Sequence, residues 1–374
     1  MCEGELVMSE KIYIDNYRII SKTATYKNDA IYLIDWQSGI LYEYSLIDKN
    51  FKIVSEKGSG LLKERTAISL LFDDNDSLFI CFANQNNYKN IIKYSFKEDS
   101  FTQLGSYDDS LSNDLIVKTA FLYNEKIFTF PIKTTYGIEI FDINKSSYTD
   151  NISFSNEDIT NKSLTNCFLY GDEIWFGIID TPYLASFSLK SHKITYFKLS
   201  EDYEIESVSY DNDGLWISFF NQPFVMKYFL DNSTDEKCFL KLDLQDNKSE
   251  HIAFIQENQD NVFCFFENLT KIDVLNSKNH STKIITPGKV GRIHKNMYKK
   301  RALFEKYLRI NNEVYIIPWI MESLPCVNLE SMEINNINTL MKGNCLNDLK
   351  NNQIFLKEEI CENTLNSFIE LIEK

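Results

Sequence analysis

Seven short apolar runs recur along the chain at nearly constant spacing, and this repeat limits the possible folds more than any other feature. Their first residues are separated by 47, 49, 47, 41, 47 and 52 residues. A period of about 40–50 residues is typical of one four-stranded blade of a β-propeller. The runs are Ile31–Trp36, Leu78–Ala83, Ile127–Ile132, Ile174–Ile179, Leu215–Phe220, Val262–Glu267 and Val314–Trp319.

A second apolar run follows each first run, 7 to 13 residues later when counted from start to start. Its first position is always aliphatic, and its fifth position is mostly Ser, Asp or Asn. Another apolar segment precedes each first run, and a more polar segment follows each second run. The second runs begin at Leu41, Ile91, Ile138, Leu184, Val225, Leu269 and Leu324.

Four strand-like segments repeated seven times predict an all-β fold, a seven-bladed β-propeller of four-stranded antiparallel blades. One blade cannot bury both of its faces alone, so we expect a single propeller domain over residues 11–340. Six or eight blades are the alternatives, because Lys11–Tyr17 can complete the last blade or pair elsewhere. The predicted units are 17–57, 61–107, 115–155, 163–201, 204–246, 250–287 and 302–338.

The expected turns contain little glycine or proline, which number only 12 and 6 among 374 residues. The segments before the first runs are instead rich in Asn and Asp. These residues tolerate positive φ and bond their own backbone, so we expect them to close the hairpins.

Two of the hairpins, EKIFTFPIKTTYGIEIFDINKS (125–146) and NEVYIIPWIMESLPCVNLESMEI (312–334), carry a resemblance to known repeats. Their form resembles the degenerate propeller repeats of the kelch, PQQ and two-component-regulator kind. The resemblance covers about 320 residues and implies a propeller with a funnel-shaped central site. It transfers no catalytic residues.

The two ends of the chain lack the repeat. We expect residues 1–10 to be disordered or to contain a mis-annotated start, with Met8 as the true first residue, because the residues before Met8 have no pattern. No basic segment followed by an apolar core is present there, which predicts no signal peptide and a cytoplasmic location. Residues 341–374 form a predicted tail with an amphipathic helix over 357–373. Its apolar stripe comprises Cys361, Leu365, Phe368, Ile369 and Ile372.

The net charge of −15 and the pI near 4.9 describe an acidic surface. Such a surface repels nucleic acid and anionic membranes, so we expect neither as a partner. We predict a monomer without a cofactor. The segment 287–301 differs, because it holds six Lys or Arg residues and no acid. It is either an anion-binding rim loop or a solvated loop that balances nearby acid.

The eight cysteines are widely spaced, and no two are closer than 16 residues. This spacing excludes the paired motifs of zinc and redox sites. Several cysteines, including Cys81 and Cys264, lie inside apolar runs, which predicts reduced thiols buried in the core.

Seven residues are candidates for ligand binding, and each has a structural alternative. Trp36 and Trp319 end their runs near a hairpin, where an indole can stack on a sugar or peptide or cap the core. His251 begins an expected inner strand beside Glu250, where it can bind a metal or move protons. Trp175 and Trp216 align with aromatic residues of every other unit and are expected in the core. The remaining candidates belong to the basic segment: Arg292, Lys299, Lys300 and Arg301.

The sequence contains none of the usual hydrolase, zincin, dinucleotide or P-loop motifs. We therefore predict a binding or scaffolding module that recognises a peptide or protein partner through the funnel and one rim. One alternative is a propeller lyase or hydrolase with carboxylates in the channel and a possible metal. The other alternative is a carbohydrate-recognition module that uses Trp36 and Trp319.

Overall fold

The structure is a computed structural model, and it describes most of the repeat region. The described residues are 19, 21–36, 38–62, 66–82, 91–105, 117–200, 202–211, 214–230, 238–241, 251–267, 269–287, 306–317 and 323–339.

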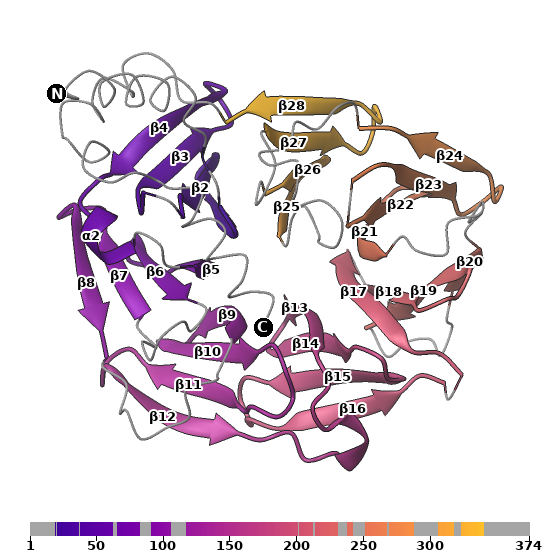
Figure 1. The fold of residues 1–374 in the computed structure, drawn as a ribbon, viewed down its shortest axis with the longest axis horizontal. Helices are drawn as coiled ribbons and strands as arrows, with labels where there is room; N and C mark the ends of the chain where they lie inside the picture. The colour runs from indigo at the N-terminus through magenta and orange to yellow at the C-terminus, as the bar shows by residue number, and fades with distance from the viewer. Residues whose placement is uncertain are drawn as a thin grey trace, which may run out of the picture.

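Seven four-stranded antiparallel sheets, each in simple up-and-down order, form a ring around a central channel (Figure 1). The first strand of each sheet lies nearest the channel and the fourth lies outermost. The strands are β1 (Ala24–Lys27), β2 (Ala30–Ile34), β3 (Leu41–Ser45) and β4 (Asn50–Ser55) in blade 1; β5 (Ala67–Phe72), β6 (Ser77–Phe82), β7 (Ile91–Ser95) and β8 (Ser100–Leu104) in blade 2; β9 (Val117–Tyr123), β10 (Lys126–Pro131), β11 (Ile138–Asp142) and β12 (Ser147–Ile152) in blade 3; β13 (Leu164–Tyr170), β14 (Glu173–Ile178), β15 (Tyr183–Ser188) and β16 (Ile194–Lys198) in blade 4; β17 (Ile205–Asp211), β18 (Gly214–Phe219), β19 (Phe224–Phe229) and β20 (Cys238–Lys241) in blade 5; β21 (Ile252–Asn258), β22 (Asn261–Phe266), β23 (Ile272–Asn276) and β24 (Thr282–Ile285) in blade 6; and β25 (Tyr307–Ile310), β26 (Glu313–Ile316), β27 (Ser323–Asn328) and β28 (Ile334–Asn338) in blade 7.

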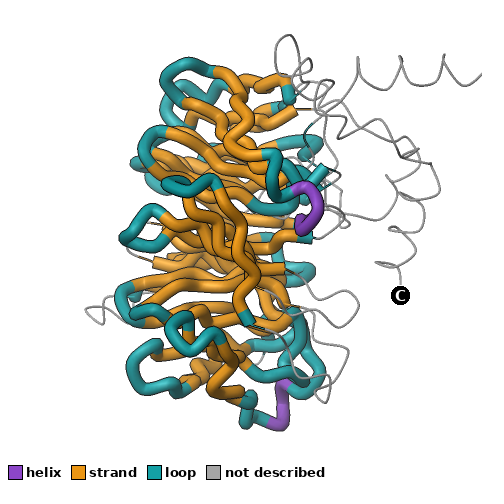
Figure 2. The backbone as a smooth tube through the Cα atoms, turned by 90° about the vertical axis from the view of Figure 1, so that its left-hand side faces the viewer, coloured by secondary structure: helices purple, strands orange, loops and turns teal. Residues whose placement is uncertain are grey.

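This arrangement confirms the predicted seven-bladed propeller, and each sheet lies within one predicted unit. Two short helices, α2 (Ser59–Leu62) and η1 (Glu157–Ile159), lie in connections between blades and on the same face of the disc (Figure 2). Within the described ranges, no helix is long and apolar enough to cross a membrane. Residues 1–10, Lys11–Tyr17 and the expected C-terminal helix lie outside the described residues.

The core consists of seven apolar clusters, and each cluster lies between two neighbouring blades. One cluster joins Phe130 of blade 3 to Phe176 of blade 4, and another joins Leu33 of blade 1 to Tyr315 of blade 7. The second cluster closes the ring without exchange of a strand, because residues 307–338 supply all four strands of the last blade. Ile19 adds a backbone hydrogen bond to Thr339 at 3.3 Å.

The aromatic residue at the second position of each first run is buried in every blade, as predicted. Each of these residues lies in the second strand and packs between blades, where a large apolar side chain contributes most to burial. They are Tyr32, Phe79, Phe128, Trp175, Trp216, Phe263 and Tyr315.

The turns between the third and fourth strands explain the polar fifth position of the second runs. Ser45 Oγ accepts a hydrogen bond from the backbone N–H of Asp48 at 3.0 Å, and Asp142 Oδ1 accepts one from Lys145 at 3.1 Å. His192 and His280 take positive φ in the equivalent turns of blades 4 and 6.

The predicted register of the sixth unit is wrong by three residues. The second run there begins at Ile272 rather than Leu269, so Asn276 is its polar fifth residue. The Asn276 side chain accepts a hydrogen bond from the backbone N–H of Asn279 in the turn at 3.0 Å. The strand pairing agrees, because Val262 pairs with Leu275 in blade 6 at the position where Ile31 pairs with Tyr44 in blade 1.

Four cysteines among the described residues are free and buried, as expected of small core side chains: Cys81, Cys167, Cys264 and Cys326. Burial raises the pKa of the Cys81 thiol to about 12, so this thiol stays protonated near neutral pH.

A polar network joins the inner strands of blades 5, 6 and 7. Asp211 at the end of β17 accepts the backbone N–H of Glu257 in β21 and pairs with the Arg309 guanidinium in β25. Lys227 pairs with the Glu257 carboxylate at 2.7 Å, and the Trp216 indole donates to the same oxygen at 3.3 Å. Burial raises the pKa of Asp211 to about 6, although the Glu257 N–H and Arg309 act in the opposite direction.

Replacing Phe128 by alanine should lower the free energy of unfolding by about 3–5 kcal/mol, because it opens a cavity between blades 3 and 4. Urea unfolding followed by fluorescence measures the change. Ile47→Ala is the control: Ile47 is 76% exposed, so the expected change is within about 0.5 kcal/mol. Equal losses in the two variants would contradict the central role of the clusters.

Asp211 should make stability fall as pH rises from about 4 to about 6. The pKa of Asp211 is raised in the folded protein, so the unfolded chain loses this proton at lower pH than the folded chain does. The contribution of Asp211 to the free energy of unfolding therefore decreases by up to about 3 kcal/mol as the pH rises. Asp211→Asn lacks this ionisation. As the pH rises from 4 to 7, the wild type should therefore lose stability relative to the variant, which is measured as the difference between their free energies of unfolding in urea. A difference that is constant with pH would contradict the raised pKa of Asp211.

Candidate functional site

An irregularity repeated in the inner strands directs side chains into the channel. In β5, β9, β13, β17 and β21, the pairing with the second strand skips one or two residues close to the start of the strand. Such β-bulges leave a residue outside the ladder and re-aim its side chain. The bulge residues are Ile68, Lys118, Thr165 with Asn166, Glu206 and Ala253.

All of these bulge residues line one cavity of about 400 Å³ at the end of the channel where the inner strands begin. Blade 1 adds Lys22, which precedes β1, and blade 7 adds Lys306 and Tyr307. Loops after the second strands contribute Phe220 and Glu267. Every blade therefore supplies part of the lining, which only a closed ring can achieve.

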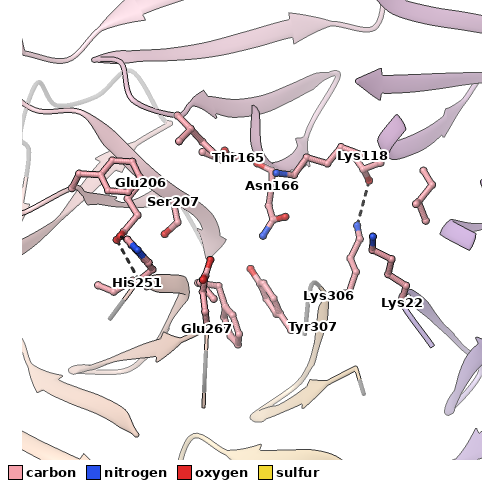
Figure 3. A pocket seen from close by; sticks show the side chains of 17 residues that line it. Lys22, Lys118, Thr165, Asn166, Glu206, Ser207, His251, Glu267, Lys306 and Tyr307 are labelled. Carbon is pink, nitrogen blue, oxygen red and sulfur yellow. Dashed lines mark hydrogen bonds and ion pairs between the residues drawn. The ribbon is translucent and has the colours of Figure 1, made fainter. Parts of the chain in front are cut away.

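Three lysines define one side of this cavity (Figure 3). We call Lys22, Lys118 and Lys306 the lysine wall. Lys306 Nζ donates to the Thr119 hydroxyl at 3.3 Å, and Lys118 Nζ donates to the backbone carbonyl of Leu164.

The opposite side of the cavity carries Glu206 and His251, which lie on adjacent blades (Figure 3). His251 Nδ1 and Glu206 Oε1 are 2.7 Å apart, and Ser218 Oγ donates to Glu206 Oε2 at 3.0 Å. The backbone N–H of Ile252 donates to the same oxygen at 3.3 Å. We call the pair of Glu206 and His251 the acid–imidazole pair.

The environments of these two side chains differ. Burial raises the pKa of Glu206 above its ordinary value, although the hydrogen bonds from His251, Ser218 and Ile252 oppose the shift. The His251 side chain is 51% exposed, and its ring packs against the Phe220 ring in a T-shaped arrangement with a centroid distance of 5.8 Å. A half-exposed imidazole whose Nδ1 is bonded to a carboxylate can exchange a proton with a ligand in the cavity.

A stack of aromatic rings from blades 6 and 7 supports the cavity. The Phe254 and Tyr307 centroids are 3.8 Å apart, and Phe265 lies 4.2 Å away on the other side of Phe254. Tyr307 and Lys306 also line a second cavity of about 750 Å³, which extends to Arg309 and Asn311 at the end of β25. The two cavities thus share residues along the channel.

The structure places the sequence-derived candidates in different environments. His251 lies at the predicted start of an inner strand, but its partner there is Glu206 of the preceding blade. Trp36 is only 7% exposed and packs in the cluster between blades 6 and 7, which matches its structural alternative. Trp319 and the basic candidates Arg292, Lys299, Lys300 and Arg301 lie outside the described residues.

Sequence reasoning missed the lysine wall and Glu206. A signal for them exists, because the bulge position holds Ile68, Lys118, Glu206 and Ala253 in different blades, whereas the second position of each first run is aromatic in every blade. Comparing the inner strands position by position could have identified this variation. Among the described residues, no group of three or more His, Cys, Asp or Glu is arranged to hold a metal ion.

Comparison with known protein families and with curated proteins gave no match to this sequence. Solved structures do match. YCF48 bound to D1 peptide aligns with a TM-score of 0.57 and 11% identity over 87% of this chain and 96% of that chain. YCF48 from Cyanidioschyzon merolae aligns with a TM-score of 0.54 and 9% identity over 82% of this chain and 95% of that chain. The β-propeller domain of Cps50 (Swd1) from Myceliophteria thermophila aligns with a TM-score of 0.53 and 11% identity over 87% of this chain and 98% of that chain. At these identities the likeness shows the fold alone, and the chain is a seven-bladed β-propeller similar to these.

Proposed function

We propose that this propeller is a binding module and that its partner is a peptide or a peptide segment of a protein. The segment enters the 400 Å³ cavity at the start of the inner strands. The carrying observation is the charge pattern of that cavity, where the lysine wall faces the acid–imidazole pair and Glu267 (Figure 3).

The chemistry of the lining fits a peptide. A peptide segment carries amide groups and often charges of both signs, so it can meet lysines on one side and carboxylates on the other. Asn166 adds a side chain that can hydrogen-bond to amide groups, and Phe220 adds apolar surface. A cavity of this size lies in the range of ordinary ligand pockets, about 300–1,000 Å³. The structure of YCF48 with a bound peptide lends support by analogy, since that propeller has a similar fold.

The acid–imidazole pair favours a second candidate, an enzyme that moves a proton to or from its substrate. A carboxylate that holds one nitrogen of an imidazole fixes the orientation of the ring, so its other nitrogen can take part in acid–base chemistry. Glu206 also has a structural task, because it accepts the backbone N–H of Ile252 and so links blades 5 and 6. This task accounts for Glu206 without catalysis, and we therefore rank the binding function first.

Filling the cavity should abolish peptide binding. Ala253 lies at the bulge of β21 and lines the cavity, so Ala253→Trp puts a large ring into it. Peptides selected from a random display library on the wild-type protein should bind this variant at least about tenfold more weakly, a loss of about 1.4 kcal/mol or more, by fluorescence anisotropy.

Ile47→Trp is the matched control, because it adds the same ring at an exposed position of the β3–β4 turn. This variant should bind as the wild type does, and thermal unfolding should show both variants folded. Undiminished binding to Ala253→Trp, or a library that yields no binding peptide, would refute the proposed function.

A further inference from the structure

We propose that Nε2 of His251 is a hydrogen-bond acceptor subsite of the cavity, where it binds an N–H group of the peptide segment. Glu206 is the positioning residue that holds the imidazole in its accepting state. This inference rests on the proposed function and names the ligand group that one side of the cavity recognises. Neither the fold nor its likeness to other propellers assigns this role to the acid–imidazole pair.

The first argument concerns the position of the ring proton. Glu206 Oε1 lies 2.7 Å from His251 Nδ1. Glu206 Oε2 accepts the backbone N–H of Ile252 at 3.3 Å and the hydroxyl of Ser218 at 3.0 Å. Hydrogen bonds from two donors favour the ionised carboxylate, which can only accept. Nδ1 therefore carries the proton of this contact, and in a neutral imidazole the other nitrogen, Nε2, is then an acceptor.

The second argument is that the imidazole is held in place and its second nitrogen remains available. The His251 ring packs against the Phe220 ring, and the His251 carbonyl accepts the backbone N–H of Glu267 at 3.0 Å. The half-exposed His251 side chain lines the cavity, and none of the described residues hydrogen-bonds to its Nε2. An acceptor that is fixed before the ligand arrives loses little conformational freedom on binding.

The third argument is the charge of the pair. A neutral His251 ring and an ionised Glu206 together carry one negative charge on the side of the cavity opposite Lys22 and Lys306 (Figure 3). This charge attracts the positive end of an N–H bond and repels an oxyanion. A peptide supplies such donors from its backbone amides and from amide, ammonium or indole side chains. The ligand group at His251 is therefore an N–H donor.

NMR of the ring nitrogens tests the accepting state without any ligand, since a protonated and an unprotonated imidazole nitrogen resonate at different ¹⁵N shifts. At about pH 8, the wild type should show Nδ1 protonated and Nε2 unprotonated. A charged ring or the opposite tautomer would overturn the proposal. This measurement needs no variant to fold, apart from His251→Asn as an aid to assignment.

Glu206→Gln should invert the tautomer. The amide oxygen of glutamine can still accept from Ile252 and Ser218, but its NH₂ group must donate to Nδ1, so the ring proton moves to Nε2. A change of tautomer reports on positioning of the ring, which a purely structural role of Glu206 would not produce. The same tautomer in this variant as in the wild type would overturn the positioning role.

Peptide binding should follow the state of Nε2. Asparagine in place of His251 still offers an N–H donor to Glu206, but it is too short to place an acceptor where Nε2 lies. The library-selected peptides should bind His251→Asn and Glu206→Gln about tenfold more weakly than the wild type, although the second variant keeps the imidazole. His280→Asn is the matched control, because it makes the same change in an exposed turn of blade 6 and should bind as the wild type does. Thermal unfolding should show the variants folded.

Peptides that lack one N–H group at a time identify the ligand group and its source. Each backbone amide is replaced by an ester, and each side chain with an N–H group by an apolar one of similar shape. One replacement should weaken binding to the wild type about tenfold but leave binding to His251→Asn unchanged. Its position shows whether the donor is a backbone or a side-chain group. The lack of any such position would overturn the subsite.

The variants also separate this proposal from the proposed function. Peptides that bind His251→Asn and Glu206→Gln as they bind the wild type, but fail to bind Ala253→Trp, overturn the subsite and leave the binding function intact. Undiminished binding to all three variants overturns both.

Discussion

The burial of apolar surface between neighbouring blades is the interaction on which the rest of this structure depends. Each blade presents an apolar face on both sides, and the seven clusters lie between blades rather than within them. A blade at an open end would expose one face to water, so the chain gains its stability only when the ring closes. Here an apolar cluster joins the last blade to the first, and all four strands of the last blade come from one contiguous segment.

Closure of the ring creates a second constraint at its centre, where seven inner strands each present an unpaired edge. Backbone N–H groups along such an edge need acceptors when they are buried. Side chains of the preceding blade supply several of them: Ser69 Oγ accepts from Ala120, Ser209 Oγ from Ile255, and Glu206 from Ile252. The polar residues of the channel therefore hold the blades together, and a polar residue there is not by itself evidence of a ligand site.

The bulges separate the two tasks. Residues that stay in the ladder, such as Ser69 and Ser209, bond the neighbouring blade, whereas bulge residues such as Lys118 and Ala253 face the cavity. Glu206 does both, since it lies at a bulge, accepts an edge N–H and holds His251. The lysine wall and the acid–imidazole pair thus meet across a cavity whose walls are fixed by the same bonds that hold the ring.

Much of the fold could be predicted from the sequence, because a propeller repeats one local pattern. Run spacing, the aromatic second position and the polar fifth position each follow from strand alternation and turn chemistry within one unit, so Trp175 and Trp216 were placed correctly in the core. The one register error, at Leu269 against Ile272, arose where two similar apolar starts lie three residues apart and only strand pairing distinguishes them.

The candidate site could not be predicted from the sequence, apart from the position of His251. Lys22, Lys118 and Lys306 are far apart along the chain, and each alone is an ordinary charged residue. Only closure of the ring brings blades 1, 3 and 7 to one cavity, and only the bulges turn their side chains into it. The sequence by itself thus determined the number and shape of the blades through local periodicity, whereas the tertiary structure decided which charges meet, because their proximity comes from contacts between blades.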